Sequence, residues 1–339
     1  EGGVVAARTL LLRWNGSEWR SAPALEVALG GGSLGAPSGS FFTGIGGSSA
    51  VDVWAVGGRY VDGRLRPLVQ RFDGARWTVA AIPDPVGDAT RVFDSYLGAV
   101  AAASPADAWA VGFDRNDGEP EGAPLALHWD GRDWHVTPIP RVPGCERARG
   151  LHDVSAEPRG TAWLVGACED RDGHPRAFVL AWDSNQWRVA LSAERVGAFT
   201  QLSSIAATGD GEVWAVGHRV LGAADDAPGE PLTFRHDPGT GWRAVPPPPS
   251  AATYGLRLNA VAVAGPGLAW VVGDTANNPA LHDGVSFAMR WDGARWIREP
   301  VGQVGETLWG VDVHDGGRAL AVGANGKGGH SLIFARHDP

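Results

Sequence analysis

The sequence is poor in several residue types. Lys327 is the only lysine and Met289 the only methionine, and the chain holds three tyrosines and two cysteines. It has no apolar run long enough to span a bilayer and no basic amphipathic stretch, so we expect no membrane span. Its formal net charge is −9 and its arginines form no stripe, which argues against nucleic acid as a partner.

The local motifs of common enzyme and metal sites are also missing. The sequence contains no GxSxG elbow, P-loop or dinucleotide fingerprint, and its ten histidines show no HExxH pattern. Two acidic stretches, residues 114–121 and 169–172, alternate oxygen ligands with other residues but lack the spacing of an EF-hand loop. Solvated turns explain them more simply. We therefore predict no metal and no cofactor.

What the chain has in abundance is a repeat. The phrase AWAVG at 108–112 has counterparts around Trp54, Trp163, Trp214 and Trp270, about 50 to 56 residues apart, and a sixth copy without tryptophan at 320–323. An apolar phrase precedes each copy, as at 97–102, and another that ends in aromatic residues follows, as at 125–134. A unit of this size cannot bury its apolar faces alone, so it stacks on copies of itself.

Each phrase is typical of a β-strand. The apolar runs are too short for helices and are rich in β-branched and aromatic residues. Asp-Gly pairs at 73–74, 130–131 and 292–293, with Asn-Gly at 15–16 and Asp-Ser-Asn at 183–185, supply the positive φ angles of tight hairpin turns. Four antiparallel strands per repeat, numbered here from first to fourth, predict a β-propeller.

The strand phrases also predict the number of blades. First and second strands occur together six times, the fourth strand six times and the third strand seven times. The chain starts with a third and a fourth strand and ends with a first, a second and a third, so its two ends complement each other. We predict an all-β protein with a single domain over residues 1–339, a six-bladed β-propeller closed by N- and C-terminal strands. Seven blades are the alternative.

The repeat resembles the kelch repeat of the galactose-oxidase-like propellers. The most similar phrases are VWAVGG at 53–58 and FRHDPGTGWRAVPPPP at 234–249, although only the first copy has the Gly-Gly pair. The resemblance implies a propeller fold over nearly the whole chain. In galactose oxidase it also implies copper beside a Cys–Tyr crosslink, but neither Cys145 nor Cys168 lies in such a setting, so we expect no copper.

The sixteen tryptophans call for two explanations. Fifteen lie on second, third or fourth strands, where large aromatic side chains pack between blades. Trp309 lies on the first strand of the last copy, where the other copies carry Thr43, Gly98, His152, Ser203 and Asn259. Because the first strand is innermost in a propeller, we expect Trp309 at the mouth of the central channel.

We place a ligand site on the face that carries the long connections, the long-loop face. These connections are 113–124, 167–176, 218–231 and 274–285 within blades, and 81–95, 138–149 and 245–256 between blades. Long loops on a rigid scaffold are where binding groups usually lie. The candidate ligand-binding residues are Trp309, His152, Asp153, Asn259, Tyr96, Tyr254, Arg91, Arg149 and Arg257. The leading hypothesis is a non-catalytic, monomeric module that binds a small molecule, a glycan or a protein. The alternative is a hydrolase, lyase or cyclase-type enzyme at the channel mouth.

The two cysteines predict a disulfide. Cys145 lies in the loop that enters the third full repeat, and Cys168 lies just past the second strand of that repeat. A bridge between Cys145 and Cys168 suits an oxidising compartment, so we expect a secreted, periplasmic or cell-surface protein. Two free thiols in a cytoplasmic protein are the alternative. Residue 1 is not methionine, and a removed signal segment would leave no trace.

Overall fold

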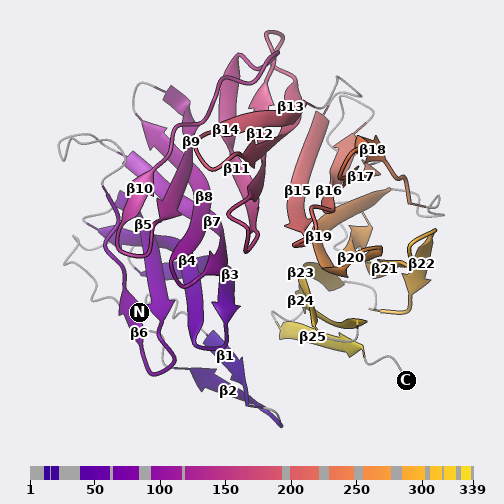
Figure 1. Cartoon of the computed structure of the whole chain (residues 1–339), viewed down its shortest axis with the longest axis horizontal. Coiled ribbons are helices and arrows are strands. Elements are labelled where there is room, and N and C mark those ends of the chain that lie inside the picture. Colours follow the sequence, from indigo (N-terminus) through magenta and orange to yellow (C-terminus); the bar gives the residue numbers. More distant parts are fainter. Residues whose placement is uncertain are drawn as a thin grey trace, which may run out of the picture. The chain divides into compact units, whose positions relative to one another are not determined.

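The computed structural model of the chain is built from β-strands. It describes residues 11–15, 17–22, 39–61, 64–83, 93–116, 119–192, 199–220, 229–247, 255–275, 285–301, 306–314, 317–325 and 330–336. These residues form 25 strands and no α-helix (Figure 1). Within them, no helix is long and apolar enough to cross a membrane.

Six sheets follow one plan, in which antiparallel strands that are consecutive in the chain are neighbours in the sheet. Five sheets have four strands and one has three. The four-stranded sheets are β3 (Ser40–Ser49), β4 (Asp52–Val61), β5 (Arg64–Phe72) and β6 (Trp77–Val79); β7 (Phe93–Ser104), β8 (Asp107–Asn116), β9 (Glu119–Trp129) and β10 (Trp134–Val136); β11 (Arg147–Ala156), β12 (Ala162–Glu169), β13 (Pro175–Trp182) and β14 (Trp187–Ser192); β15 (Phe199–Ala207), β16 (Val213–Val220), β17 (Gly229–Asp237) and β18 (Gly241–Ala244); and β19 (Leu256–Gly265), β20 (Leu268–Thr275), β21 (Ser286–Trp291) and β22 (Trp296–Glu299). The three-stranded sheet is β23 (Glu306–His314), β24 (Arg318–Asn325) and β25 (His330–Arg336), and β1 (Leu11–Trp14) pairs with β2 (Trp19–Ala22).

The turns between third and fourth strands contain the predicted positive φ angles. Gly74, Gly131 and Gly293 have φ values of 92°, 94° and 96°, and Ser184 takes the same place with 74°. The aspartate before each of them stabilises the turn. Asp130 accepts hydrogen bonds of 2.8 Å from the backbone N–H groups of Arg132 and Asp133. These bonds favour the carboxylate and hold the pKa of Asp130 well below its usual range.

The connections within blades differ from the prediction, because the strands continue into them. The sequence predicts a loop at 113–124, but β8 runs to Asn116 and β9 begins at Glu119. Likewise, β16 extends to Val220 and β17 starts at Gly229. Backbone pairing requires no apolar side chain, so polar residues such as Asp114, which pairs with Ala123, continue the ladder.

The predicted packing of tryptophans between sheets is confirmed for several of them but not for Trp14 and Trp19, which are partly exposed and contact each other within the β1–β2 hairpin. The ring centroid of Trp54 on β4 lies 5.2 Å from that of Trp129 and 5.1 Å from that of Trp134, both in the next sheet. Trp214 on β16 contacts Trp296 in its next sheet in the same way, at 5.2 Å. Trp54 and Trp214 are fully buried. The tryptophan of a second strand therefore ties one sheet to the following one.

The chain divides into two compact units, Glu1–Ile139 with Ala148–Gly160, and Pro140–Arg147 with Thr161–Pro339. Within the first unit, β7 packs against β3, β4 and β5. Within the second, β15 packs against β12 and β13, β19 against β15 to β17, and β23 against β19 to β21. The first strand of a sheet thus covers the preceding sheet. The described pairs join β1 to β2 and β25 to β24, so closure by both ends of the chain stays a prediction, as does a single domain.

Candidate functional site

The first strands of five sheets carry a β-bulge at a repeated position. The register of the first and second strands shifts between Phe42 and Gly44 in β3, and at the equivalent place in β7, β15, β19 and β23. The residues left unpaired by these shifts are Thr43, Gly98, Ser203, Asn259 and Trp309. A bulge turns a side chain out of the strict alternation of a strand, and bulges often lie next to functional sites.

In these five sheets, the glycine that ends the second-strand phrase lies opposite the bulge. A Cβ atom on Gly112 would lie 2.2 Å from the carbonyl oxygen of Tyr96, and one on Gly217 would lie 1.9 Å from that of Gln201. Contacts this short are not tolerated, so only glycine fits opposite the bulged strand. The repeated glycine in the sequence is therefore the visible sign of a bulge in the neighbouring strand.

Two bulged side chains join their sheet to the next one. The hydroxyl of Thr43 donates a hydrogen bond to the carbonyl of Leu97. The Nδ2 atom of Asn259 donates to the carbonyl of Leu308 at 2.8 Å and to a carboxylate oxygen of Asp274 at 3.1 Å. In both cases the acceptor carbonyl belongs to the residue directly before the next bulge. These side chains hold neighbouring first strands in register.

Trp309 has a different environment from Thr43 and Asn259. Its side chain has an exposed fraction of 61 %, although it lies on a first strand whose neighbour Leu308 is fully buried. No other described residue forms a ring contact or hydrogen bond with its indole. The indole thus leaves a large flat aromatic surface accessible to solvent.

Polar groups gather beside Asn259, where β19 begins and β16 and β20 end. Arg257 on β19 and Asp274 on β20 lie opposite each other in the strand register. His218 lies on β16, against which β19 packs. Asp274 is buried, and this burial raises the pKa of its carboxyl group against the opposing effects of Asn259 and Arg257. Burial and the charge of Arg257 lower the pKa of His218 to about 4, so His218 is neutral at neutral pH.

Three predicted residues lie on neighbouring first strands of the second unit. Asn259 bonds to the Leu308 carbonyl, next to Trp309 in the sequence, and to Asp274, which also interacts with Arg257. Sequence reasoning missed His218 and Asp274. A signal for both was present, because each directly follows the glycine of its second strand. The other copies carry Gly58, Phe113, Ala167 and Ala324 at this position.

The other predicted residues lie elsewhere. Tyr96 is half-buried between the rings of Phe41 and Phe113, at centroid distances of 6.5 and 5.8 Å. A carboxylate oxygen of Asp153 accepts the backbone N–H of Val154 at 2.8 Å. Also on β11, the side chain of His152 is half-buried and that of Arg149 is exposed. Arg91 and Tyr254 lie outside the described residues. The four described residues all belong to the first unit.

The predicted disulfide is present. Cys145 and Cys168 are bonded, with their Cα atoms 5.6 Å apart, and the backbone N–H of Glu146 donates to the carbonyl of Glu169 at 2.7 Å. The bridge therefore fastens the loop before β11 to the end of β12. Ion pairing between Arg147 and the buried Glu169, at 3.6 Å, adds to this connection.

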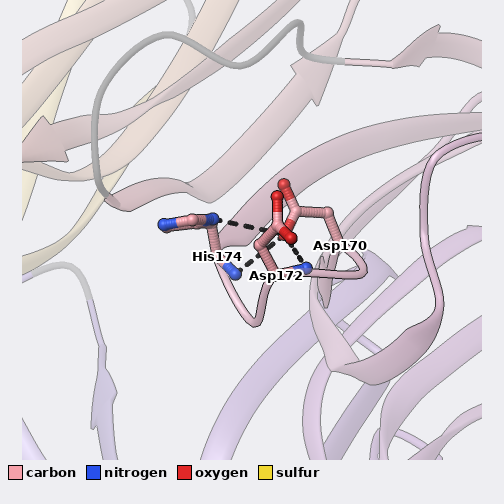
Figure 2. Close-up of side chains that lie close together, drawn as sticks. All are labelled: Asp170, Asp172 and His174. Atoms are coloured by element: carbon pink, nitrogen blue, oxygen red, sulfur yellow. Dashed lines mark hydrogen bonds and ion pairs between the residues drawn. The ribbon is translucent and has the colours of Figure 1, made fainter.

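The acidic loop after Cys168 is a turn. Figure 2 shows Asp170, Asp172 and His174, whose ligand atoms lie within 4.8 Å of one another. The Asp170 carboxylate already accepts the backbone N–H groups of Asp172 and His174 at 3.0 Å and the Nε of Arg176 at 3.2 Å. These bonds lower its pKa to about 2. Because its oxygens are used within the hairpin, we assign no metal to this cluster.

An apolar hollow of about 990 Å³ lies between the β1–β2 hairpin and the sheet of β3 to β6. Trp14 and Trp19, which are partly exposed, line it together with Phe72 and Trp77. In other sheets, the aromatic residues at the positions of Phe72 and Trp77, such as Trp129 and Trp296, contact the tryptophan of the preceding sheet. The hollow thus has the lining of a packing face between sheets.

Comparison with known proteins identifies the fold. No protein-family model matches the chain, and no curated protein matches it in sequence. Among solved structures, a protein of unknown function from Dyadobacter fermentans matches with a TM-score of 0.55 and 13 % identity, over 88 % of this chain and 95 % of its own. SapL1 lectin, solved with α-methyl fucoside, matches with a TM-score of 0.53 and 13 % identity, over 89 % and 93 %. The Hadza microbial sialidase Hz136 matches with a TM-score of 0.52 and 14 % identity, over 86 % and 64 %.

These similarities and the six repeated sheets show an all-β, six-bladed β-propeller fold. The finer resemblance to kelch repeats stays a prediction.

Proposed function

We propose that the protein is a non-catalytic binding propeller that holds its ligand on the long-loop face, at Trp309, Arg257 and Asn259. The observation that carries this proposal is the exposure of Trp309. Thr43 and Asn259, at the same bulge, are engaged in bonds to the next sheet, whereas the Trp309 indole is 61 % exposed. A rigid, amphipathic aromatic group gives much contact area at little cost in conformational entropy.

The ligand class that fits these groups best is a glycan. A sugar ring presents apolar C–H groups, which suit the face of an indole, and hydroxyl groups, which suit a donor such as the Arg257 guanidinium and an acceptor such as the amide oxygen of Asn259. The propeller lectin SapL1, whose structure contains α-methyl fucoside, shares the fold with this chain. At 13 % identity the likeness concerns the fold alone, so the ligand class rests on the side chains.

A glycan panel tests the proposal. We expect the protein to bind at least one oligosaccharide of the panel in a microarray or by calorimetry, and Trp309→Ala to abolish the signal. Trp14→Ala is the matched control, because Trp14 is also half exposed but lies in the β1–β2 hairpin. Absence of binding to any glycan, or an equal loss in both variants, contradicts the proposal.

An enzyme is the second candidate function, and His218 with Asp274 favours it. A neutral histidine and a carboxyl group of raised pKa are the states that general bases and general acids require near neutral pH. If the site is catalytic, His218→Gln abolishes turnover of a bound glycan and leaves its affinity unchanged. A wild-type protein that binds the glycan and leaves it intact over days supports the non-catalytic proposal.

We further propose that the protein works as an exported monomer. The bond between Cys145 and Cys168 supports an oxidising compartment. Light scattering coupled to gel filtration measures the mass of the protein in solution. A mass twice that of the chain would contradict the proposal that the protein is a monomer.

A further inference from the structure

Arginines on the sheets around the candidate site are paired with carboxylates. On the second unit's sheets, Arg219 pairs with Glu230 at 2.5 Å, Arg235 with Glu212 at 2.9 Å and Arg290 with Glu299 at 3.3 Å. All three arginines are about three-quarters buried or more, and their donors are directed to acceptors of the same sheet. Pairing of this kind is what a half-buried guanidinium normally needs.

Arg257 differs from these three arginines in its pairing. It is half-buried at the start of β19, yet in the described part of the chain no acceptor lies within hydrogen-bonding or ion-pairing distance of its guanidinium. Its cross-strand partner Asp274 is near enough to feel its charge, but an oxygen of that carboxylate accepts the Asn259 amide. Among the described residues, the five N–H donors of Arg257 thus have no acceptor within hydrogen-bonding distance, as a ligand-binding guanidinium would.

Two titratable groups interact with Arg257 in the part of the chain that the structure describes. His218 is neutral at neutral pH and adds no charge, and burial raises the pKa of the Asp274 carboxyl group, which favours its uncharged form beside Arg257. Leu256, Arg257 and Leu258 pair with Thr275, Asp274 and Gly273 in the β19–β20 ladder, which holds the Arg257 backbone in place. A planar guanidinium matches a carboxylate in a bidentate pair more closely than it matches single hydroxyl groups.

We infer that Arg257 is the anion-binding residue of the site and that the glycan ligand is acidic, with a sugar carboxylate paired to Arg257. This inference rests on the proposed glycan-binding function. In this arrangement the Trp309 indole contacts a sugar ring, and Arg257 selects the acidic sugar over its neutral counterpart.

The test compares each acidic glycan with its own methyl ester. Oligosaccharides that end in glucuronic, galacturonic or sialic acid form the acidic arm, and the same compounds with esterified carboxyl groups form the neutral arm. We expect at least one acidic glycan to bind ten times more tightly than its ester. Arg257→Gln should remove that difference, and Arg257→Lys should restore part of it. Arg243→Gln, at an exposed arginine of β18 paired with Asp237, is the control and should retain the preference.

The outcomes separate the two proposals. Equal affinity for acid and ester, with binding still lost in Trp309→Ala, overturns the inference and leaves the glycan-binding function in place. Loss of binding to both arms in Arg257→Gln, with a lowered melting temperature, also overturns it, because Arg257 is then a structural partner of Asp274. No binding in either arm overturns the proposed function. If sulfated oligosaccharides bind more tightly than carboxylated ones, Arg257 binds an anion of another class. That result contradicts the inference that a sugar carboxylate pairs with Arg257.

Discussion

At the scale of single residues, the same side chain has two roles in this protein, and its strand decides which one it takes. A tryptophan on a second strand, such as Trp163 with an exposed fraction of 8 %, lies among aromatic residues of the next sheet, including Trp242 at 5.9 Å. Trp309 on a first strand is largely exposed. Burial removes apolar area from water and thus stabilises the fold, whereas an exposed ring contributes little to folding.

The first prediction compares truncation at these two positions. Trp163→Ala should lower the free energy of unfolding by about 3–5 kcal/mol, because it leaves a cavity between sheets. Trp309→Ala should change it by no more than about 0.5 kcal/mol. Denaturant titration of both variants measures the two values. A loss for Trp309→Ala as large as that for Trp163→Ala assigns Trp309 to the core.

The second prediction concerns pH and His218. Its folded-state pKa of about 4 lies below the ordinary value of 6.5, so the unfolded chain binds this proton more readily. The stability that neutral His218 provides is complete above pH 6.5 and decreases as the pH falls towards 4. The melting temperature of His218→Gln should therefore decrease less between pH 7 and pH 4.5 than that of the wild type. Parallel pH profiles for the two proteins contradict the assignment, since all other titrating groups are shared.

At the scale of elements, the unit of this fold is a bulged first strand with a glycine opposite. The glycine admits the bulged backbone, and the bulge aims one side chain per sheet out of the strand's alternation. The bulge cannot form without the glycine, because any larger residue would clash with the bulged backbone.

The third prediction tests this pairing within one sheet. In Gly217→Ala the new Cβ would meet the Gln201 carbonyl at 1.9 Å, so the strands must separate. We expect a loss of about 1–3 kcal/mol, the usual effect of overpacking. Gly209→Ala is the matched control, because a Cβ there has no neighbour within 4 Å. Chemical denaturation measures the free energy of unfolding of both variants. Equal values would show that the bulge accommodates the added Cβ without loss of stability.

The fourth prediction concerns the disulfide. Cys145 and Cys168 are 23 residues apart in the sequence, and closing a loop of this size stabilises a protein by about 3 kcal/mol in the chain-entropy model. The double variant Cys145→Ser with Cys168→Ser should lose about that much. Thiol titration of the unfolded, unreduced wild type should find no reactive thiol. Two titratable thiols, or an unchanged stability of the double variant, contradict a structural bridge.

The strands, turns and sheet plan were predictable from the sequence because they depend on local patterns. AWAVG at 108–112 predicts the strand that β8 contains, and Asp130-Gly131 predicts a turn. The bulges were not predictable, because a register shift is a property of two paired strands. His218 and Asp274 were missed for a related reason. Each lies at the polar end of an apolar strand, and its pKa shift arises from burial by neighbouring strands and from the nearby Arg257, neither of which the sequence shows.

At the scale of the whole molecule, stability comes from a repeated contact between successive sheets. Each first strand packs against the preceding sheet within its unit, as β19 does on β15 to β17. In repeat proteins of this kind, each unit's stability depends on its neighbours. Our proposal of one domain over residues 1–339 therefore has a thermodynamic consequence.

The fifth prediction is that the chain unfolds in one cooperative transition. Scanning calorimetry should give a calorimetric enthalpy equal to the van 't Hoff enthalpy. Two resolved transitions, or fluorescence and circular dichroism curves with different midpoints, indicate that the two compact units unfold separately and contradict the single domain.

The bulged position also has an evolutionary consequence. Threonine, glycine, serine, asparagine and tryptophan all occur there without any change in the sheet around them. The sheet therefore accepts side chains of different size and polarity at this position, so mutation there can change the surface while the core sequence is preserved. A library randomised only at the bulges is accordingly the economical starting point for engineering new recognition on this chain.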